Sequence, residues 1–585
     1  MPEETMFKKN TRHLQIPLTS NIDELPEKLR KRLEHSWAGV FYKDVYSKID
    51  EAPFAVLYAD CGSRPNVPVN MFVALEFLKA GNGWTDEELY DNISYNIQVR
   101  YALGYRQLGE GDFDIRTLYY FRERLSHYMQ EKGVNLLDQG FEKVTDAQLK
   151  AFQVKTGKQR MDSVQVASNI RQMGRVQLLV EVLQRVERIL NELDKVHYSE
   201  AFAPYLKGHS GHYVYRMKGE EVSPHLERIG AFMQQLLAEL KPAYGTQAVY
   251  QVLERVFSEH FNIEQTKVSA KPNTELTSSC MQSPDDLEAT FREKRGVGYQ
   301  GYVANLTETC DPENKLQLIT KVQLAPNNTD DDQMLAEALP NLKERTEVDE
   351  MNTDGGYGGR KSNPVLAALN VELIQSAIRG RNPDPEKPQL ADFDIQLGED
   401  SKPRQVTCPG GQKVSVRPSS QQKSYVACFE LPQCLECPLF KDGKCLAKEG
   451  KQNDKRLRLR FTLADAQASQ RRRRSKESKR RSGNLRAAVE ATVRSVKLPF
   501  PEAQLPVRGQ FRVTCMLIGS AAIANVRRIQ RYLQAKLREE MRQNKVQDLQ
   551  DSAPDELALS FLESARTFLA RLLRFRLVLS PMLAG

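Results

Sequence analysis

Three acidic residues in distant parts of the chain have surroundings that suit metal-assisted chemistry. The first is Asp162 in QRMDSVQVASN, where the alternation predicts a short strand with Asp162 and Ser163 at its beginning. A carboxylate in a buried strand costs free energy unless a partner compensates its charge, and a metal ion would be such a partner. A turn aspartate bonded to nearby backbone is the alternative, and the strand alone does not exclude it.

The second acid, Asp354, stands in TDGGYGG. The four glycines of this motif let the backbone bend sharply beside the carboxylate. An ordinary glycine turn has the same composition, so the motif is not diagnostic alone. It gains weight only together with acids from elsewhere in the chain.

The third acid is Glu490, the single acid among Arg486, Arg494 and Lys497 at the end of the basic stretch 471–497. Spacings of four, four and three residues predict that these side chains share one face of a helix. A surface helix with salt bridges is one interpretation. The other is a carboxylate held where cations that bind a polyanion converge.

Taken together, the three acids fit a mixed sheet flanked by helices that brings distant carboxylates to one place. Asp162, Asp354 and Glu490 would then hold two Mg²⁺ or Mn²⁺ ions about 4 Å apart, since these ions prefer oxygen ligands. One ion would activate a water or a 3′-hydroxyl group, and the other would stabilise the leaving oxygen.

Cysteines predict a second kind of metal site. Five of the nine cysteines lie within 408–445, and an odd number in a chain we expect to be cytosolic argues against a disulfide framework. The spacing indicates structural zinc held by four thiolates, with Cys428 as a spare or a substitute. Reduced cysteines without metal are the alternative. The four predicted zinc ligands are Cys408, Cys434, Cys437 and Cys445.

Charge indicates a polyanionic partner. The 585-residue chain carries a net charge of +8, but 451–481 alone holds 13 Lys and Arg against three acids. Such a concentrated basic tract favours nucleic acid as the partner, although a solvated tail is the alternative. The chain contains no run of 18 apolar residues and starts with a polar segment, so we expect a cytosolic protein without membrane span or signal peptide.

Helical patterns dominate the first 150 residues. Pro68 and Gly83 bracket an apolar run, and Thr85 with Glu88 forms a capping-box pattern at the start of the next helix. Helix, short turn and helix suit a DNA-binding module, although a plain helical bundle has the same periodicity. Three arginines of this region could contact phosphate: Arg116, Arg122 and Arg124.

Later segments predict the rest of the architecture. An apolar seam from Val176 to Leu193 begins a helical insertion that reaches residue 265. Two strands within 298–325 form a hairpin, a helix follows with its N-cap among residues 329–332, and 370–380 contains another strand. A buried helix over 507–533 closes the core. Three of its residues are expected to face solvent or DNA: Asn525, Arg527 and Arg528.

These pieces together resemble the DDE transposases of bacterial insertion sequences, which have a ribonuclease-H-like catalytic core. The resemblance rests on the ordered motifs MDSVQVASNI, SPDDLEATFREKRGVGYQGYVANLTETCD, TDGGYGG and the pattern from Arg486 through Glu490 to Lys497. The N-terminal NVPVNMFVALEFLKAGNGWTDEELYDNISYN and the cysteine-bearing insertion are also similar to that branch. The resemblance spans roughly 30–530. One departure is Gly483, where a large branch of the family has tyrosine.

The resemblance implies metal-dependent cleavage of double-stranded DNA at element ends and joining to target DNA. Asp162, Asp354 and Glu490 would hold the metals, and Arg486 and Lys497 would contact DNA near the scissile phosphate. The basic tract would grip the phosphate backbone. Its predicted DNA-binding residues are Arg471, Arg472, Arg473, Arg474, Lys479, Arg480 and Arg481.

The expected fold class is α/β, with a ribonuclease-H-like mixed sheet, an all-α N-terminal domain, a helical insertion and a small Cys-rich insertion. The protein is expected to act as a homo-oligomer on paired ends in the cytoplasm, associated with the nucleoid. Two alternatives stay open: a metal-dependent nuclease without strand transfer, and an inactive DNA-binding regulator. The expected segments are 1–150 (DNA-binding helices), 151–170 (first core strand), 171–280 (insertion), 281–380 (core), 381–470 (zinc-knuckle-like), 471–535 (basic tract and Glu helix) and 536–585 (tail).

Overall fold

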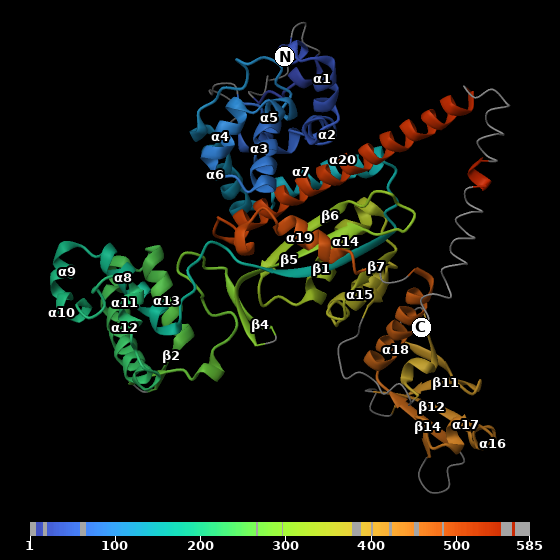
Figure 1. The fold of residues 1–585 in the computed structure, drawn as a ribbon. Coiled ribbons are helices and arrows are strands. Elements are labelled where there is room, and N and C mark those ends of the chain that lie inside the picture. The colour runs from blue at the N-terminus through green and yellow to red at the C-terminus, as the bar shows by residue number, and fades with distance from the viewer. Residues whose placement is uncertain are drawn as a thin grey trace, which may run out of the picture.

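A mixed sheet lies at the centre of this computed structural model (Figure 1). Its strands follow the order β4-β5-β1-β7-β8, and a sixth strand, β6, also pairs with β5. The strands are β1 (Lys158–Val166), β4 (Thr290–Lys294), β5 (Val297–Thr309), β6 (Ile319–Pro326), β7 (Glu350–Thr353) and β8 (Glu372–Gln375). The structure describes residues 7–15, 20–58, 66–264, 267–294, 296–376, 388–398, 402–419, 424–449, 456–482, 485–551 and 564–567.

Strand β1 occupies the middle of this sheet. It pairs antiparallel with β5, where Asp162 faces Leu306, and parallel with β7. Strands β5 and β6 form the predicted antiparallel hairpin, closed by a turn in which Asn314 N–H donates to the carbonyl oxygen of Asp311. The mixed α/β class predicted from the sequence is therefore confirmed.

Helices cover the sheet and connect its parallel strands. Helix α14 (Asp331–Thr346) joins β6 to β7, and its N-cap residue is Asp330, one of the predicted N-caps; α15 (Ser362–Ala368) joins β7 to β8. Buried side chains of both helices pack with Met161 and Met351 of the sheet. The remaining core helices, α19 (Val489–Lys497) and α20 (Gln510–Asp551), follow late in the chain.

Seven α-helices and four short 3-10 helices make up the N-terminal part of the described chain. The predicted capping box at Thr85 and Glu88 is present, and Gly83 ends its helix at a φ of 70°, which suits glycine. The helices are α1 (Glu27–Glu34), α2 (Trp37–Asp44), α3 (Val69–Asn82), α4 (Asp86–Tyr95), α5 (Ile97–Ala102), α6 (Ile115–Lys132) and α7 (Leu136–Ala151).

Helix α20 joins these helices to the sheet. It packs so closely on α3 that a Cβ on Gly519 would come within 2.7 Å of the Ala80 Cβ. The prediction that Asn525 faces solvent or DNA is wrong, whereas Arg528 keeps part of its side chain exposed while pairing with Glu308. Asn525 is fully buried and bonds both the N–H (2.8 Å) and the carbonyl oxygen (2.9 Å) of Ile319, because its amide satisfies β6 backbone that the helix covers.

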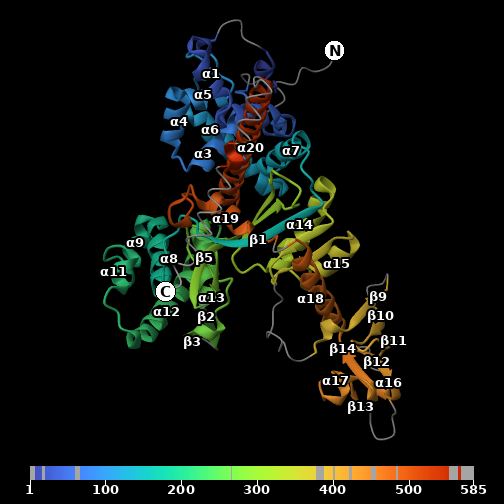
Figure 2. The same ribbon diagram turned by 45° about the vertical axis from the view of Figure 1, so that its right-hand side comes forward.

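A separate helical unit is inserted between β1 and β4, as Figures 1 and 2 show. It has its own apolar core, which includes the predicted seam from Val176 to Leu190. Leu193, also predicted in that seam, is 84% exposed because the first helix ends at Ile189. Its elements are α8 (Arg175–Ile189), α9 (Glu192–His197), α10 (Ser199–Phe202), α11 (Ser210–Val214), α12 (Val222–Tyr244), α13 (Ala248–His260), β2 (Phe261–Glu264) and β3 (Lys267–Ala270).

The segment that holds the five clustered cysteines contains a second sheet of order β13-β14-β12-β11-β10-β9, set apart from the central one (Figure 2). Of the five, only Cys428 lies on a strand of this sheet. Helix α18 (Leu463–Ser482) leads from this sheet back to the core. None of the described helices is both long and apolar enough to cross a membrane. The strands and short helices are β9 (Asp394–Leu397), β10 (Pro403–Thr407), β11 (Lys413–Pro418), β12 (Tyr425–Glu430), α16 (Leu431–Leu435), α17 (Pro438–Lys441), β13 (Lys448–Glu449) and β14 (Arg456–Phe461).

Candidate active site

Asp162 lies in the middle of β1, not at the beginning of the strand as predicted. The strand starts earlier because Lys158 to Arg160 pair with β7. Only 7% of Asp162 is exposed, and its Oδ1 accepts a hydrogen bond of 3.1 Å from Ser163 N–H. The carboxylate therefore stands on the face of a central strand, largely removed from solvent.

Asp354 follows the last residue of β7. The parallel ladder pairs Lys158 with Glu350 and ends where Arg160 pairs with Asn352. Asp354, two residues further on, lies close enough to Asp162 for its charge to raise the pKa of Asp162. Asp354 Oδ1 accepts a 2.7 Å hydrogen bond from Gly356 N–H, so the glycine turn orients the carboxylate. The two aspartates, 192 positions apart in the sequence, are thus neighbours across adjacent strands.

Tyr357 of the same glycine loop anchors it in the core. Its ring is fully buried, and its hydroxyl donates a 2.8 Å hydrogen bond to Asn305 Oδ1 on β5. Burial, with further contributions from Asp331, Asp162 and Asp354, raises the pKa of Tyr357 well above its usual range. This residue was not predicted from the sequence, although a lone aromatic residue between two glycine pairs is a signal that could have suggested an anchor.

Arg486 lies beside both aspartates. Its Nη2 donates a 2.9 Å hydrogen bond to Asp162 Oδ2. Burial works against the charge of Arg486, but Asp162, Asp354 and Glu490 outweigh this and raise its pKa. The prediction that Arg486 shares a helix with Glu490 is wrong: residues 485–488 form a turn, and Arg160 Nη1 fixes that turn by donating to the Leu485 carbonyl oxygen at 2.8 Å.

Glu490 is exposed in the first turn of α19, whose other face buries Val489 and Val496. Lys497 lies in the last turn and is half-buried, with its Nζ donating to the Gln165 carbonyl oxygen of β1 at 3.2 Å. Burial lowers the pKa of Lys497. Helix α19 thus runs beside β1, with Glu490 at one end and Lys497 at the other.

The environment of Asp162 opposes its negative charge. Burial is the largest effect and raises the pKa of Asp162; Arg486 lowers it, and the neighbouring Asp354 raises it further, so that the pKa is raised overall. Two carboxylates and one arginine therefore leave unbalanced negative charge at a buried site. A cation bound there would relieve it.

Glu308 on β5, which the sequence analysis missed, connects α19 and α20 to the sheet. It has no exposed surface, and it accepts hydrogen bonds from Arg160 Nε (2.6 Å), Arg528 Nη1 (2.6 Å) and Thr492 Oγ1 (2.7 Å). Thr492 is two residues from Glu490 along α19. This buried network fixes the helix that carries Glu490 against the strand that carries Asp162.

The donor atoms suit a hard cation, because carboxylate oxygens are the ligands that Mg²⁺ and Mn²⁺ prefer. The charge of Asp354 acts on Asp162, and the charges of Asp162, Asp354 and Glu490 all act on Arg486. Among the described residues, however, no group of three or more His, Cys, Asp or Glu side chains is gathered closely enough to hold an ion as it stands. Arg486, hydrogen-bonded to Asp162 Oδ2, provides the positive charge instead.

The arginines of α18 contact the core. Arg471 Nη1 donates to Asn363 Oδ1 at 3.1 Å, and Arg474 pairs with Glu372 on β8 at 3.1 Å. Arg473 pairs with Asp394 and, at 3.6 Å, with Glu477. Arg472 is half-buried on the same helix. The side chains of Lys479, Arg480 and Arg481, and the whole of Gly483, lie outside the described residues.

The four predicted zinc ligands line one small cavity of about 60 Å³, and Cys428 on β12 is not among the lining residues. A Cβ built on Gly410 would lie 3.3 Å from Cys437 Sγ and 3.6 Å from Cys408 Sγ, so these sulfurs surround one piece of backbone. Burial, followed by the neighbouring cysteines, raises the pKa of Cys434. The thiols converge, but within the described chain they do not form a ready metal-binding group.

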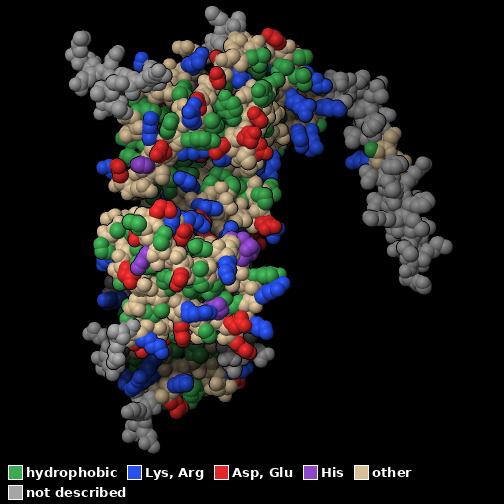
Figure 3. Space-filling model, turned by 90° about the vertical axis from the view of Figure 1, so that its left-hand side faces the viewer, with side chains coloured by type: hydrophobic (Ala, Val, Ile, Leu, Met, Phe, Trp, Pro, Cys, Tyr) green, Lys and Arg blue, Asp and Glu red, His purple; other side chains and the backbone are tan. Residues whose placement is uncertain are grey.

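The three arginines proposed for phosphate contact in the N-terminal helices have partners within the protein. Arg122 pairs with Glu76 at 2.7 Å and Asp86 at 2.8 Å. Arg116 pairs with Asp114 at 2.9 Å, and the Arg124 guanidinium lies 5.0 Å from the ring centroid of Tyr58. On the face seen in Figure 3, basic side chains are likewise interspersed with acidic ones.

Comparison with known families identifies two segments of the chain. Residues 407–530 match the family described as "Transposase DDE domain", and residues 28–124 match "Transposase domain (DUF772)". The first match includes the four converging cysteines, Arg486, Glu490 and Lys497; the second covers α1 to the middle of α6. No curated protein and no solved structure matches the chain.

Proposed function

The two family matches indicate a DDE transposase of an insertion sequence, and from this premise we propose that the chain cleaves and joins DNA at element ends by metal-dependent phosphoryl transfer. Asp162, Asp354 and Glu490 are the proposed catalytic acids. The observation that supports the proposal is the closeness of the two aspartates: β1 and β7 pair in parallel up to Arg160 and Asn352, the charge of Asp354 acts on Asp162, and Arg486 donates to Asp162 at 2.9 Å.

The three carboxylates would hold Mg²⁺ or Mn²⁺, which supplies activation of the attacking oxygen and charge stabilisation at the leaving oxygen. The residues of the chain supply the ligand oxygens and hold them in place. Buried Asp162 and the glycine-held Asp354 fix two sets of oxygen ligands on rigid backbone, and Glu490 reaches the site from α19. Tyr357 and Glu308 hold the loop and the helix in register with β1.

Arg486 and Lys497 are proposed to contact the DNA backbone on either side of the reacting phosphate. Arginine offers a planar fork for phosphate oxygens, and lysine offers a point charge. Both cations contact β1 close to Asp162: Arg486 donates to Asp162 Oδ2 at 2.9 Å, and Lys497 donates to the Gln165 carbonyl oxygen at 3.2 Å. They therefore lie against the strand that carries the first proposed catalytic acid, where a reacting phosphate would be held.

Three further parts of the proposal go beyond the family matches. The central sheet, with the first acid on its middle strand, supports a ribonuclease-H-like core. The convergence of Cys408, Cys434, Cys437 and Cys445 on one cavity supports structural zinc, which thiolates bind tetrahedrally. Because cutting two element ends requires paired sites, we also propose that the protein acts as a homo-oligomer on double-stranded DNA.

The test is a cleavage and joining assay on DNA that carries the inverted repeats flanking the coding region, with Mg²⁺ or Mn²⁺. Asp162→Ala, Asp354→Ala and Glu490→Ala should each abolish cleavage, while the matched change Asp23→Ala on the N-terminal surface should not. Activity that survives all three active-site changes overturns the proposal. Cleavage without joined products would identify a nuclease, and DNA binding without cleavage would identify a regulator.

A further inference from the structure

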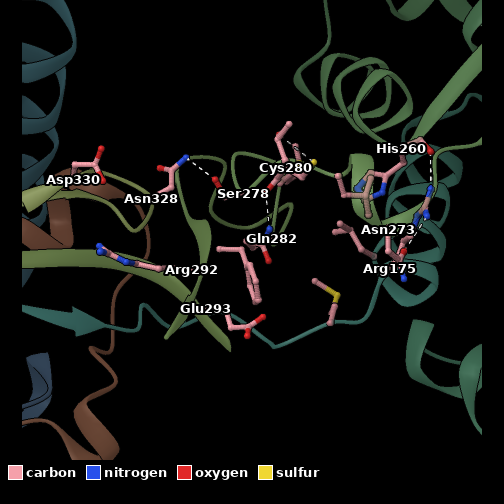
Figure 4. A pocket seen from close by; sticks show the side chains of 16 residues that line it. Arg175, His260, Asn273, Ser278, Cys280, Gln282, Arg292, Glu293, Asn328 and Asp330 are labelled. Atoms are coloured by element: carbon pink, nitrogen blue, oxygen red, sulfur yellow. Dashed lines mark hydrogen bonds between the residues drawn. The ribbon is translucent and has the colours of Figure 1, made fainter. Parts of the chain in front are cut away.

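A second site lies between the helical insertion and the edge of the central sheet. It is a cleft of about 580 Å³, bounded by the start of α8, the end of α13, the segment 273–282 and β4. Figure 4 shows Arg175, His260 and Asn273 at one end and Arg292, Asn328 and Asp330 at the other. None of these residues belongs to the proposed catalytic site.

His260 is the unusual residue of this cleft. It is 3% exposed, and within the described residues neither of its ring nitrogens has a hydrogen-bond partner. Burial, together with Arg175 and Lys271, lowers the pKa of His260 to about 4, so the ring is neutral at neutral pH. A neutral imidazole offers one donor and one acceptor, and a buried pair of this kind calls for a ligand that satisfies both.

The cation beside His260 is already engaged. Arg175 Nη1 donates to the Lys271 carbonyl oxygen and Nη2 to the His260 carbonyl oxygen, both at 2.7 Å. Its Nε is buried and, in the described part of the chain, lacks a hydrogen-bond partner. This end of the cleft therefore presents the donor and acceptor of a neutral imidazole and one unmatched N–H of a guanidinium whose other nitrogens donate to neutral oxygens. Ring nitrogens, ring N–H groups and carbonyl oxygens on the edge of a nucleobase can match all three.

The middle of the cleft is apolar on one side. Phe291 of β4 contributes its ring, which packs so close to Gly298 that a Cβ there would be 2.8 Å from Phe291 Cε2. Leu276 and Met281 extend this apolar wall. A flat aromatic ligand with a hydrogen-bonding edge would contact the wall with its face and His260 with its edge.

We propose that this cleft binds an unpaired nucleobase of the DNA substrate. The inference rests on the proposed function, which brings DNA to the same sheet. Strand β5 connects the two sites: its first half pairs with β4 at the cleft, and its second half pairs with β1 around Asp162. A base still stacked in a duplex cannot enter, so the cleft would act on a frayed end or a single strand.

The test compares binding of two labelled probes by fluorescence anisotropy, without divalent metal: a single-stranded oligonucleotide of mixed sequence and the same strand with abasic sites. Since base stacking on an aromatic ring contributes about five- to a hundredfold per base, the full-length protein should prefer the strand with bases by at least fivefold. Phe291→Ala should bring the ratio close to one, and Phe291→Tyr should restore it. Tyr215→Ala, an exposed aromatic of the insertion outside the cleft, should leave the ratio unchanged.

A second measurement does not depend on variant folding. Photo-crosslinking of the wild-type protein to an oligonucleotide containing 4-thiothymidine should label peptides within 273–293. Equal binding of both probes, no binding of either, or crosslinks only elsewhere overturns the inference. Metal and cleavage play no part in this experiment, so these outcomes would leave the proposed DNA cleavage untouched. Conversely, a protein that prefers the strand with bases but does not cleave DNA would overturn the cleavage proposal and leave the base-binding cleft standing.

Discussion

Arg486 donates a 2.9 Å hydrogen bond to Asp162, and the two residues are 324 positions apart in the sequence. This contact brings the turn before α19 onto the middle strand of the sheet. The charges of Asp354 and Glu490 also act on Arg486 and, together with that of Asp162, raise its pKa. One guanidinium thus occupies the place where the charges of three distant acids meet, and a catalytic metal ion would have to share or displace it.

Replacing Asp162 with asparagine should separate activity from stability. The pKa of Asp162 is raised in the folded protein, so ionisation of this group opposes folding at any pH above the folded pKa. We expect Asp162→Asn to raise the melting temperature at pH 7, with the gain shrinking as the pH falls through the raised pKa toward 3.8, its value in the unfolded chain. Cleavage should fall by about 10³-fold or more.

Thermal melting from pH 4 to pH 8 would measure this effect, with Asp23→Asn on the exposed N-terminal surface as the matched control. The control should shift the curve little at any pH. A lower melting temperature of Asp162→Asn at neutral pH would mean that the Arg486 contact outweighs burial, contrary to the direction expected here.

The sequence predicted the local elements of the site well. Strand β1, the hairpin of β5 and β6, and the start of α14 follow from alternation and capping, because these signals depend only on near neighbours. The pairing of β1 with β7, which brings Asp354 near Asp162, depends on long-range packing that periodicity does not encode. The family resemblance supplied what the pattern could not.

Errors arose where tertiary contacts reverse a local preference. Arg486 fits a helical spacing, yet Arg160 holds Leu485 in a turn. Asn525 looks like a surface residue by type, but the β6 backbone draws it inward, and Glu308 holds Arg528 partly inward. Buried polar networks of this kind are invisible in a sequence because both partners resemble exposed residues.

Glu308→Gln should destabilise the protein strongly. Arg160 and Arg528 would remain at a buried position without their shared counter-charge, and breaking a buried ion pair costs about 3–5 kcal/mol. Urea unfolding followed by circular dichroism would measure the loss. Glu27→Gln, which breaks an exposed pair with Lys31, should change the stability by no more than about 0.5 kcal/mol. A loss below about 1 kcal/mol for Glu308→Gln would refute the anchoring role.

Removal of the predicted zinc should selectively weaken the second sheet. Metal analysis of the purified protein should detect zinc, and Cys434→Ser should abolish it, while Cys428→Ser on the neighbouring strand should retain it. Because structural zinc contributes directly to folding, a strong chelator should lower the melting temperature of the wild-type protein and leave that of Cys434→Ser unchanged. If the purified protein contained no zinc and the chelator did not change its melting temperature, the alternative of reduced cysteines without metal would be favoured.

Salt dependence should distinguish the two halves of the basic tract. Each duplex phosphate contact adds about 0.9 to the slope of log K against log salt concentration. Arg473 and Arg474 are paired with Asp394 and Glu372, so their replacement by alanine should lower thermal stability and change the slope by less than about one. Alanine at Lys479, Arg480 and Arg481 should reduce the slope by about 2–3. As a matched control, alanine at three exposed cations of the insertion should leave the slope unchanged; these are Lys207, Arg216 and Lys218. If this control changed the slope as much as alanine at Lys479, Arg480 and Arg481 does, a specific DNA contact by the tract would be ruled out.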